Sequence, residues 1–446
     1  MAKVTNLTLR HKVVYYLYIR NFTEEGTFRA VIPELERLRD LGIDIIVLQS
    51  IFPTTDIVQE PYQHGNPFVV KDFDQVNPEY GTPGDFRDLV DAIHDLGMQV
   101  VINLPLFHLA KDSKLVTEQP DFFLKDDDGN FVSRISLFDS SYDLNYNNPK
   151  LWDYLIERLE YWATLVDGFS TNHAQLIRPE FWSSARAEVE DVHPYFYWIA
   201  GIMPDVFMQN VRIIGMPYLT YHELSSFFDL IDNGAYMTWL ERFYSGKVSL
   251  ENFAYFLNWS ELNSPTTLVR LQALEYTYSE RLAKRCHDVT MLANWTAFSF
   301  FQKGTASLVM GQEYGSEEAV NYLSDDVIDW TVKHDLTPLI HQMAQIKKRE
   351  ECKNGYYFIE AYDQDVLKCS YHYYDRHLIG AFKLRPNSTP SEVQTNIPDG
   401  TYTNLLTEDT FTIKDGKFLM ADTPIIIAYQ GKLPVPTLMD KGETYV

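Results

Sequence analysis

The sequence has few cysteines and no long apolar run. Its three cysteines, Cys286, Cys352 and Cys369, are odd in number, far apart and in no spacing typical of a metal site. This pattern indicates reduced thiols in a reducing compartment. No uninterrupted apolar run approaches the ~20 residues of a membrane helix, and the polar N-terminus lacks the apolar core of a signal peptide. We therefore expect a cytoplasmic location without membrane association.

Positive charge is also scarce. The chain has 38 Lys and Arg against 62 Asp and Glu, which gives a formal net charge of -24. Nucleic acids and anionic membranes are polyanions, so this balance opposes binding to either. It suits a neutral ligand, and the 14% aromatic content supplies faces on which a sugar could stack.

An apolar run followed by an amphipathic segment recurs along the 446 residues. The runs are nearly continuous, as expected for strands of a parallel sheet that are buried on both faces. We expect strands at 13–19, 43–48, 98–106, 165–169, 196–203, 268–274 and 306–310. The run at 227–231 is a weaker candidate, which would make eight.

Helix signals separate these runs. Thr82-Pro83-Gly84-Asp85 combines an N-cap, a proline at the first helical position and an acid in the first turn, and Gly97 ends the apolar face that follows. Asn148-Pro149 starts another helix, and further helices are expected near 27–41, 178–192, 204–214, 280–303 and 336–351. A (β/α)₈ barrel fits this order best, and an open doubly wound sheet is the alternative.

The pattern divides the chain into parts. Residues 1–106 and 148–353 form the predicted barrel, and 107–147 are too long for an ordinary loop and are predicted to form an inserted loop domain. After about residue 354 the runs become short and alternating, with turns between them, which predicts a C-terminal antiparallel β-sandwich over 354–432. Residues 433–446 are assigned to a tail.

Four groups of motifs resemble, in order, segments of the α-amylase family, glycoside hydrolase family 13. They are Val76–Thr82, Glu118–Phe123 with Asp126–Asn130, Asp143–Pro149, and Gly304-Thr305 through Gly311–Gly315. Each could arise by chance, but the ordered set spans nearly the whole chain. The resemblance implies a (β/α)₈ TIM barrel with a short inserted loop domain after strand 3 and a C-terminal antiparallel β-sandwich.

The chemistry of this family needs two carboxyl groups that flank the scissile bond, roughly 5–5.5 Å apart in a retaining enzyme. The stretch Val166–His173 is similar to the strand that carries the family's nucleophile, in the pattern Asp-Gly-Phe-Arg-x-Asp. Here Ser170 stands in the place of the arginine and Asn172 in that of the aspartate. An amide cannot attack a sugar carbon as a carboxylate does.

The other two acids of the family pattern are missing as well. The general acid follows an apolar run that ends in Ala-Glu or Gly-Glu, and here Gly201 takes its place, with Ile202 one register away. No Asn-His-Asp occurs in the sequence to supply the third carboxylate. The best match sets Tyr278 at that aspartate, and Asn263-Ser264-Pro265 is a second alignment that also lacks the acid. The resemblance therefore implies that no catalytic residue is intact.

The binding positions of the family are partly kept. His108 matches a sugar-contacting histidine, and Phe68 replaces a tyrosine that stacks on the sugar. Phe107 stands where the family's calcium-binding asparagine would be, so we expect no metal and no cofactor. Asn172, Tyr276 and Tyr278 are further candidates for ligand contact, although the two tyrosines could instead fill the pocket.

Other polar residues have plainer interpretations. His173 follows Asn172 on a strand and should face the opposite side, which favours a packing role. Glu275 and Glu313 could be acids at the rim of the site, but structural ion pairing is the favoured interpretation. The run Asp126–Gly129 lacks the ligand alternation of a calcium loop and is expected to be a solvated turn.

Three functional hypotheses remain. The first is a non-hydrolytic α-amylase-family protein that binds an α-glucan oligosaccharide or regulates sugar metabolism. The second is a glycoside hydrolase that acts on α-glucosidic bonds with unconventional residues. The third is a structural partner protein, similar to the amylase-like heavy chains of amino-acid transporters but without their membrane anchor.

Overall fold

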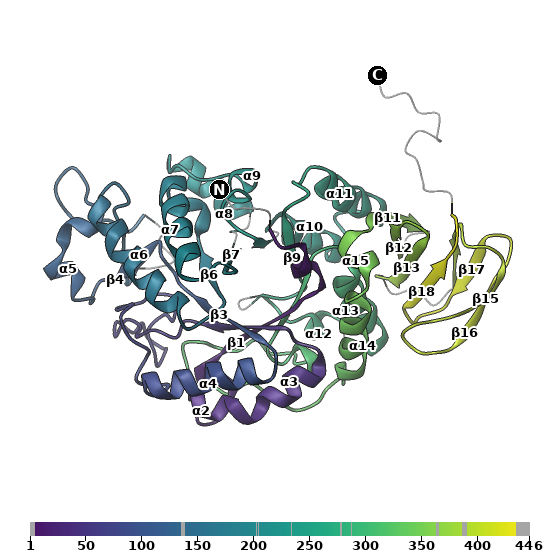
Figure 1. The fold of residues 1–446 in the computed structure, drawn as a ribbon, viewed down its shortest axis with the longest axis horizontal. Helices are drawn as coiled ribbons and strands as arrows, with labels where there is room; N and C mark the ends of the chain where they lie inside the picture. The colour runs from purple at the N-terminus through teal and green to yellow at the C-terminus, as the bar shows by residue number, and fades with distance from the viewer. Residues whose placement is uncertain are drawn as a thin grey trace, which may run out of the picture.

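The computed structural model describes residues 5–134, 139–201, 203, 205–232, 234–276, 279–286, 288–362, 365–385 and 390–433. The molecule is elongated, with a barrel in the middle, an excursion around β4 and α5 at one end and the C-terminal sheets at the other (Figure 1). Among the described residues, every helix is too short or too polar to cross a bilayer.

Eight parallel strands close into a barrel in the order β1-β10-β9-β8-β7-β6-β3-β2. This confirms the predicted (β/α)₈ barrel and excludes the open sheet. The strands are rich in β-branched and aromatic residues and are buried on both faces, as their continuous apolar runs indicate. They are β1 (Val13–Tyr18), β2 (Ile45–Gln49), β3 (Gln99–Asn103), β6 (Gly168–Asn172), β7 (Tyr197–Gly201), β8 (Leu230–Asp232), β9 (Val269–Ala273) and β10 (Thr305–Val309).

Helices surround the barrel. Thr82 caps α4 in a capping box with Asp85, and Asn148 caps α6 by accepting a hydrogen bond from the backbone of Lys150, so both predicted helix starts are confirmed. The helices are α1 (Ile19–Phe22), α2 (Phe28–Val31), α3 (Leu35–Leu41), α4 (Pro83–Asp95), α5 (Leu115–Glu118), α6 (Pro149–Ala163), α7 (Pro179–Val192), α8 (Asp205–Ile213), α9 (Tyr221–Leu224), α10 (Gly234–Tyr244), α11 (Leu250–Leu262), α12 (Leu282–Arg285), α13 (Val289–Phe301), α14 (Thr337–Lys347) and α15 (Glu350–Asn354).

Residues 107–134 and 139–147 leave the barrel after β3 and return before α6. They contain α5 and a short antiparallel pair of β4 (His108–Ala110) with β5 (Ser141–Asp143). Arg134 forms an ion pair of 2.5 Å with the buried Asp143, which fixes the return of the chain. The acidic run forms an exposed turn, in which the Asp126 carboxylate accepts the backbone amides of Asp128 and Asn130.

The C-terminal region is antiparallel. A four-stranded sheet has the order β11-β12-β13-β18, and two further pairs, β14-β17 and β15-β16, lie beside it. Its strands are β11 (Tyr356–Tyr362), β12 (Val366–Tyr373), β13 (Arg376–Lys383), β14 (Ser391–Gln394), β15 (Gly400–Thr403), β16 (Thr410–Ile413), β17 (Lys417–Met420) and β18 (Ile425–Gln430). Most of the assigned tail lies outside the described residues.

The barrel and the C-terminal sheet share one hydrophobic core. A single cluster of buried residues runs from the barrel helices into β12 and β13. Asn258 on α11 both donates to and accepts from the backbone of Ile359, at 2.7 and 3.0 Å. The Tyr371 hydroxyl donates to the carbonyl of Phe301 at the end of α13, at 2.9 Å. The two parts are therefore joined by apolar packing and by satisfied buried hydrogen bonds.

Three sequence-based expectations need correction. The strand predicted at 165–169 is β6 at 168–172, because its polar end, Ser170 to Asn172, remains in the barrel ladder. The segment predicted as one helix over 280–303 is two helices, interrupted around Cys286. Helices α10 and α11 were not predicted, and in α11 apolar residues lie all around the helix, which leaves little periodic contrast.

Candidate functional site: the barrel mouth

The candidate site lies at the C-terminal ends of the barrel strands, which we call the barrel mouth. Tyr197, Ile199 and Leu230 belong to the cluster of residues that fills the barrel interior. Alternate residues of a strand share a face, so Gly201 and Asp232, at the ends of the same strands, also face the interior. A side chain built at Gly168 would contact the ring of Tyr197, which places Ser170 and Asn172 on the interior face of β6 as well.

Asn172, which the motif predicts to match the family's nucleophile, is held among neutral polar groups. The Asn103 amide nitrogen lies 3.5 Å from both the Asn172 Oδ1 and the Ser170 Oγ. The Asn103 Oδ1 is buried and has no hydrogen-bond partner among the described residues. Asn172 itself is only partly buried, so solvent reaches it from the mouth. The position can donate and accept hydrogen bonds, but it has no carboxylate to attack a sugar.

Gly201, which the motif predicts to match the family's general acid, pairs directly with Asn172 in the parallel register of β6 and β7. A Cβ atom at Gly201 would lie 3.0 Å from the Asn172 Oδ1 and 3.2 Å from the carbonyl oxygen of Thr171. A side chain there would require these neighbours to shift by a few tenths of an ångström, so the backbone fits most closely around a glycine. Ile202, the alternative register, lies outside the described residues.

The residue that the motif predicts to match the family's third acid is not among the described residues. Tyr278 and its neighbour Thr277 lie outside the described residues, and Tyr276 is partly buried after the end of β9. Asn263, in the second alignment, forms the C-cap of α11, before β9 begins. That alignment is therefore wrong, because a residue before the strand lies at the end of the barrel opposite to the mouth.

His108 and Phe68, the predicted sugar-contacting residues, are packed inside the fold, and their contact with a ligand stays a prediction. Both are almost fully buried, at 1% and 3% exposure. The His108 Nε2 lies 2.9 Å from the carbonyl oxygen of Phe68, and burial lowers the pKa of His108 to about 4. The ring is therefore neutral and links two buried segments. His173 is buried nearby, with its ring centroid 6.0 Å from those of His108 and Phe107.

Glu275 and Glu313 are both held in buried ion pairs. Arg281 Nη1 lies 2.9 Å from Glu275, which also accepts the backbone amide of Leu282. Arg37 Nη1 lies 2.8 Å from the fully buried Glu313. Each carboxylate thus has a cationic partner within the fold, which favours a structural role for both.

One carboxylate at the mouth was missed by the sequence analysis. Asp232 is the last residue of β8 and, among the described residues of the eight barrel strands, the only acid. Its Oδ1 is inaccessible to solvent and has no hydrogen-bond partner in the described part of the chain, although the residue as a whole is only partly buried. Burial raises the pKa of Asp232 from its usual 3.8 to about 7. The sequence signal that could have revealed Asp232 is an acidic residue directly after the weakest predicted strand, 227–231.

A cleft of about 370 Å³ opens between the inserted segment and the loops that follow β6 and α8. Phe107 and Tyr146 provide apolar area in its wall, and Asn145, Asn147 and Arg178 provide amide and guanidinium donors. Arg178 is bonded to Asn147 at 2.8 Å and to Glu180 at 3.2 Å, so its charge is already compensated. This composition suits a neutral polar ligand better than an anion.

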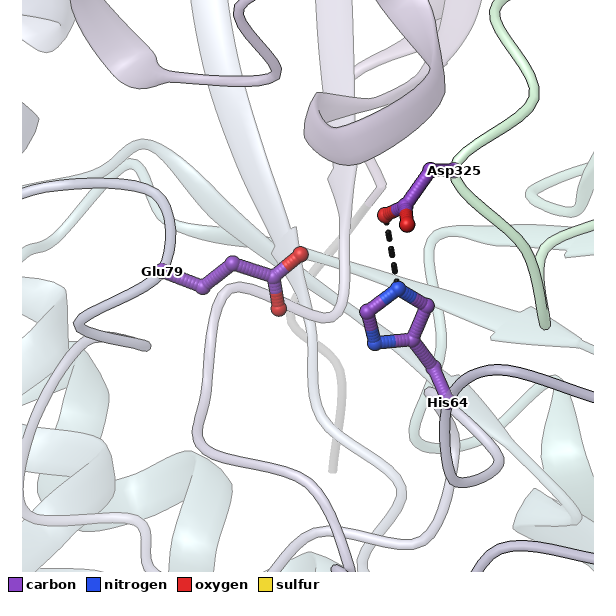
Figure 2. A group of neighbouring side chains, drawn as sticks. All are labelled: His64, Glu79 and Asp325. Atoms are coloured by element: carbon purple, nitrogen blue, oxygen red, sulfur yellow. Dashed lines mark hydrogen bonds and ion pairs between the residues drawn. The ribbon is translucent and has the colours of Figure 1, made fainter.

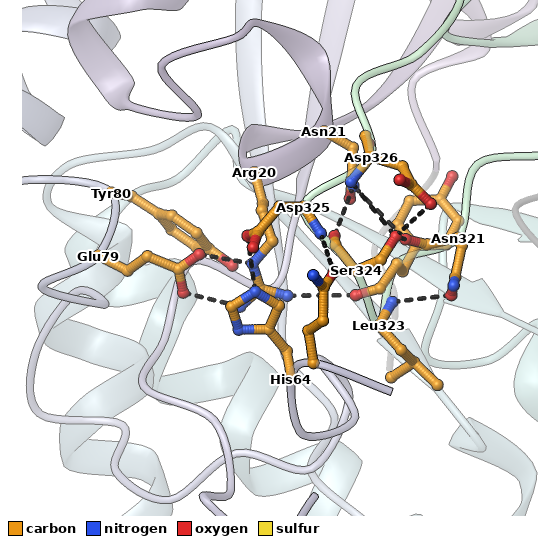
Figure 3. A network of polar contacts seen from close by, with 12 residues as sticks. Arg20, Asn21, His64, Glu79, Tyr80, Asn321, Leu323, Ser324, Asp325 and Asp326 are labelled. Atoms are coloured by element: carbon orange, nitrogen blue, oxygen red, sulfur yellow. Dashed lines mark hydrogen bonds and ion pairs between the residues drawn. The ribbon is translucent and has the colours of Figure 1, made fainter. Parts of the chain in front are cut away.

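A polar network joins two loops at the rim of the mouth. His64 Nε2 lies 2.7 Å from the Asp325 carboxylate, and Glu79 approaches them from the other side (Figure 2). Arg20 donates to both oxygens of Glu79, at 2.5 and 2.7 Å, and to the carbonyl of Tyr322 (Figure 3). A histidine and two carboxylates can bind a metal, but Glu79 and His64 are already bonded to Arg20 and Asp325. The network therefore fastens the loop after β2 to the loop after β10.

Comparison with known proteins places these observations in a family. The sequence matches the α-amylase catalytic domain over residues 16–130 and the bacterial α-amylase C-terminal domain over residues 358–427. A crystal structure of an α-amylase from Lactobacillus plantarum superposes with a TM-score of 0.91 and 29% identity, covering 95% of this chain and 100% of that one.

Two curated relatives are more distant. The α-1,4-glucan:maltose-1-phosphate maltosyltransferase of Mycobacterium tuberculosis is 27% identical over 222 residues, which are 46% of this chain and 31% of the relative. The intracellular maltogenic amylase of Bacillus subtilis is 22% identical over 348 residues, 73% of this chain and 55% of the relative. The chain thus spans about a third to about half of the length of these relatives.

The barrel, the C-terminal β domain and these matches together define a protein class with a carbohydrate-active fold. The chain belongs to the α-amylase family, glycoside hydrolase family 13.

Proposed function

We propose that this protein binds an α-glucan oligosaccharide at the barrel mouth without hydrolysing it. The observation that carries this proposal is the pairing of Asn172 with Gly201 where the family chemistry needs two carboxyl groups. General acid catalysis alone contributes about 10²–10⁴ in rate, and the nucleophile is missing as well. The partly exposed polar groups of the mouth and the adjacent 370 Å³ cleft can still bind sugar hydroxyls.

A second candidate, a glycoside hydrolase with unconventional residues, is favoured by one observation. Asp232 faces the mouth and has a pKa of about 7, a value that suits a general acid or base at neutral pH. The two-carboxylate mechanism, however, needs a second carboxyl group 5–10 Å away, roughly. Glu275 and Glu313 are each bound to an arginine, so neither is free to act with Asp232.

We also propose a cytoplasmic location, which is supported by the three buried free cysteines. The relative from Bacillus subtilis is itself described as intracellular. No feature of the described residues favours the third hypothesis, a purely structural partner.

Two measurements on the purified chain separate these functions. Maltotriose and longer maltooligosaccharides are titrated by calorimetry, and the same mixtures are assayed for reducing ends over many hours. Saturable binding without release of reducing ends is expected. Release that persists through purification and disappears in Asp232→Asn would refute the proposal in favour of the unconventional hydrolase. If neither binding nor hydrolysis is seen, the structural role becomes the better account.

A further inference from the structure

A small cavity lies beside the N-terminal ends of β9 and β10, at the end of the barrel opposite to the mouth. Leu268 and Gly304, which directly precede these two strands, form part of its wall, and the loop 264–266 forms another part. Its volume is about 40 Å³, which exceeds the roughly 10–15 Å³ that one water molecule needs. Thr266 in this wall is exposed, which gives the cavity contact with solvent.

The wall of this cavity carries an excess of positive charge. Arg10 comes from the 3-10 helix η1 (Leu7–His11), Arg270 from β9, and Lys303 from the turn before β10. Glu261, near the end of α11, is the only carboxylate among the described residues that line the cavity. Three cations and one carboxylate leave two positive charges in excess, in a chain whose formal net charge is -24. The excess is therefore a local feature of this cavity.

Glu261 does not neutralise the three cations. Its carboxylate lies 2.6 Å from Lys303 Nζ but 3.6 Å from Arg270 Nη1, which is beyond hydrogen-bond distance. Arg10 has no carboxylate partner in the described part of the chain, and it donates to two backbone carbonyl oxygens at 2.9 and 2.7 Å. These two bonds use two of the five N–H donors of its guanidinium. Donors of Arg10 therefore remain for a ligand.

The other partners of Arg270 are neutral. It donates to the carbonyl oxygen of Ser260 and to the hydroxyl of Ser264, and the hydroxyl of Tyr221 also interacts with it. Burial raises the pKa of Tyr221, so this phenol carries no charge at neutral pH. Arg10 and Arg270 are each only 7% exposed. Buried cations cost free energy unless an anion accompanies them, and one carboxylate is too few for these two guanidinium groups and Lys303.

The titration of the acid and of one cation reflects this imbalance. Burial lowers the pKa of Arg10, and the attraction of Glu261 and Tyr371 offsets this only in part. Burial also raises the pKa of Glu261, but Lys303, Arg270 and Arg10 together outweigh this effect, so the pKa of its carboxyl stays below the usual value. The cavity is therefore a site where negative charge is stabilised.

We propose that this cavity binds one small inorganic oxyanion, of the phosphate or sulfate type, between Arg10, Arg270 and Lys303. The planar fork of a guanidinium matches two oxygens of such an anion, and the ammonium of Lys303 adds a further charged donor. The anion supplies the negative charge that Glu261 alone does not. The small volume leaves no room for a sugar phosphate or a phosphorylated peptide. The site is at the far end of the barrel from the mouth, so this inference does not depend on the proposed function.

The full chain is titrated with inorganic phosphate by calorimetry at pH 8, with the ionic strength held constant by sodium MES, whose anion is too large for the cavity. Saturable binding of one phosphate per chain is expected. The melting temperature should rise with phosphate, because a ligand that binds only the folded state stabilises it. Chloride at the same ionic strength should raise the melting temperature less, since a single atom cannot accept paired N–H bonds from both guanidinium groups.

Two variants test whether phosphate binds in this cavity. Lys303→Gln should weaken phosphate binding about 10–100-fold, because one charge-assisted hydrogen bond is lost. Glu261→Gln removes the acid of the wall and should tighten phosphate binding about tenfold. Lys417 and Glu392, on the paired strands β17 and β14, form an exposed ion pair that also spans 2.6 Å. Lys417→Gln and Glu392→Gln are therefore matched controls and should bind phosphate as wild type does.

Each other outcome overturns part or all of the inference. Absence of saturable phosphate binding to wild type at tens of millimolar overturns the site. Phosphate affinity that is unchanged in Lys303→Gln also overturns it, and this variant decides the test if Glu261→Gln does not fold, because the Lys303 side chain is partly exposed. An equal response to chloride overturns the oxyanion class. Glycerol 3-phosphate that binds as tightly as inorganic phosphate overturns the exclusion of larger phosphates.

Discussion

Asp232 should make the folded protein less stable as the pH rises, and its replacement by asparagine should remove this penalty. The carboxylate has a pKa of about 7 in the folded protein against a usual value of 3.8. The folded state therefore holds its proton more tightly than the unfolded chain does. Stability falls as the pH rises from about 4 to about 7, because the unfolded chain ionises this carboxyl in that range while the folded protein keeps it protonated.

The size of the effect follows from the shift. A difference of about 3 pKa units corresponds to about 4 kcal/mol at 1.36 kcal/mol per unit. Water reaches part of the residue, which weakens the penalty, so we expect Asp232→Asn to raise the free energy of unfolding by about 2–4 kcal/mol at pH 8. The gain should fall below about 1 kcal/mol at pH 4, where the folded acid is protonated and the unfolded acid is roughly half ionised.

Urea unfolding of both proteins at pH 4, 6 and 8, with the slope m compared, measures this gain. Asp229, only three residues away, provides a control in which the change to asparagine should alter the free energy of unfolding in the opposite direction. It is buried and accepts hydrogen bonds from Arg186 at 2.9 and 3.2 Å, so Asp229→Asn should lower the free energy of unfolding by about 3–5 kcal/mol. A D232N variant that is less stable than wild type at pH 8, or whose gain does not change with pH, would refute the reasoning.

Three further outcomes follow from buried contacts. Glu313→Gln should lower the free energy of unfolding by about 3–5 kcal/mol, because Arg37 loses its partner, and a double-mutant cycle with Arg37→Met should show coupling between them. Gly168→Ala should lower the melting temperature, at a cost of about 1–3 kcal/mol, because its Cβ would lie 2.7 Å from the carbonyl oxygen of Tyr197; an unchanged melting temperature would contradict this. His108→Ala should cost about 1–3 kcal/mol in urea unfolding yet leave maltotriose affinity within about twofold, and a tenfold loss would return the ring to the ligand site.

The barrel could be predicted from sequence because its strands are buried on both faces and therefore read as continuous apolar runs. The weakest prediction was the shortest strand, β8, whose Leu230–Asp232 offers only two apolar residues before an acid. The end of β6 was assigned wrongly for a related reason, since Ser170 and Asn172 are polar although they remain in the sheet. The hydrophobic pattern of a sequence reveals the buried middle of a barrel strand. It does not reveal the polar C-terminal end, where the candidate site lies.

The site could be predicted only where a motif fixes it. Asn172 and Gly201 are paired at the ends of β6 and β7, and their match to the family's two acids stays a prediction from the motif. The roles of His108 and Phe68 could not be inferred in the same way, because a motif gives a position in the chain and does not give its exposure. Asp232 escaped notice because none of the motifs that we identified includes it and its strand was doubtful. Only the three-dimensional arrangement reveals that its Oδ1 has no hydrogen-bond partner among the described residues.

The hydrophobic core shared by the barrel and the C-terminal sheet has a consequence for folding. Since the Asn258–Ile359 and Tyr371–Phe301 contacts and the apolar cluster cross the boundary near residue 354, neither part can bury its own surface alone. The two parts should unfold in a single cooperative transition, which would allow one free energy of unfolding to describe the whole chain. A barrel cut off at this boundary would expose the aromatic faces of α11 and α13 to water, and the isolated fragment would aggregate.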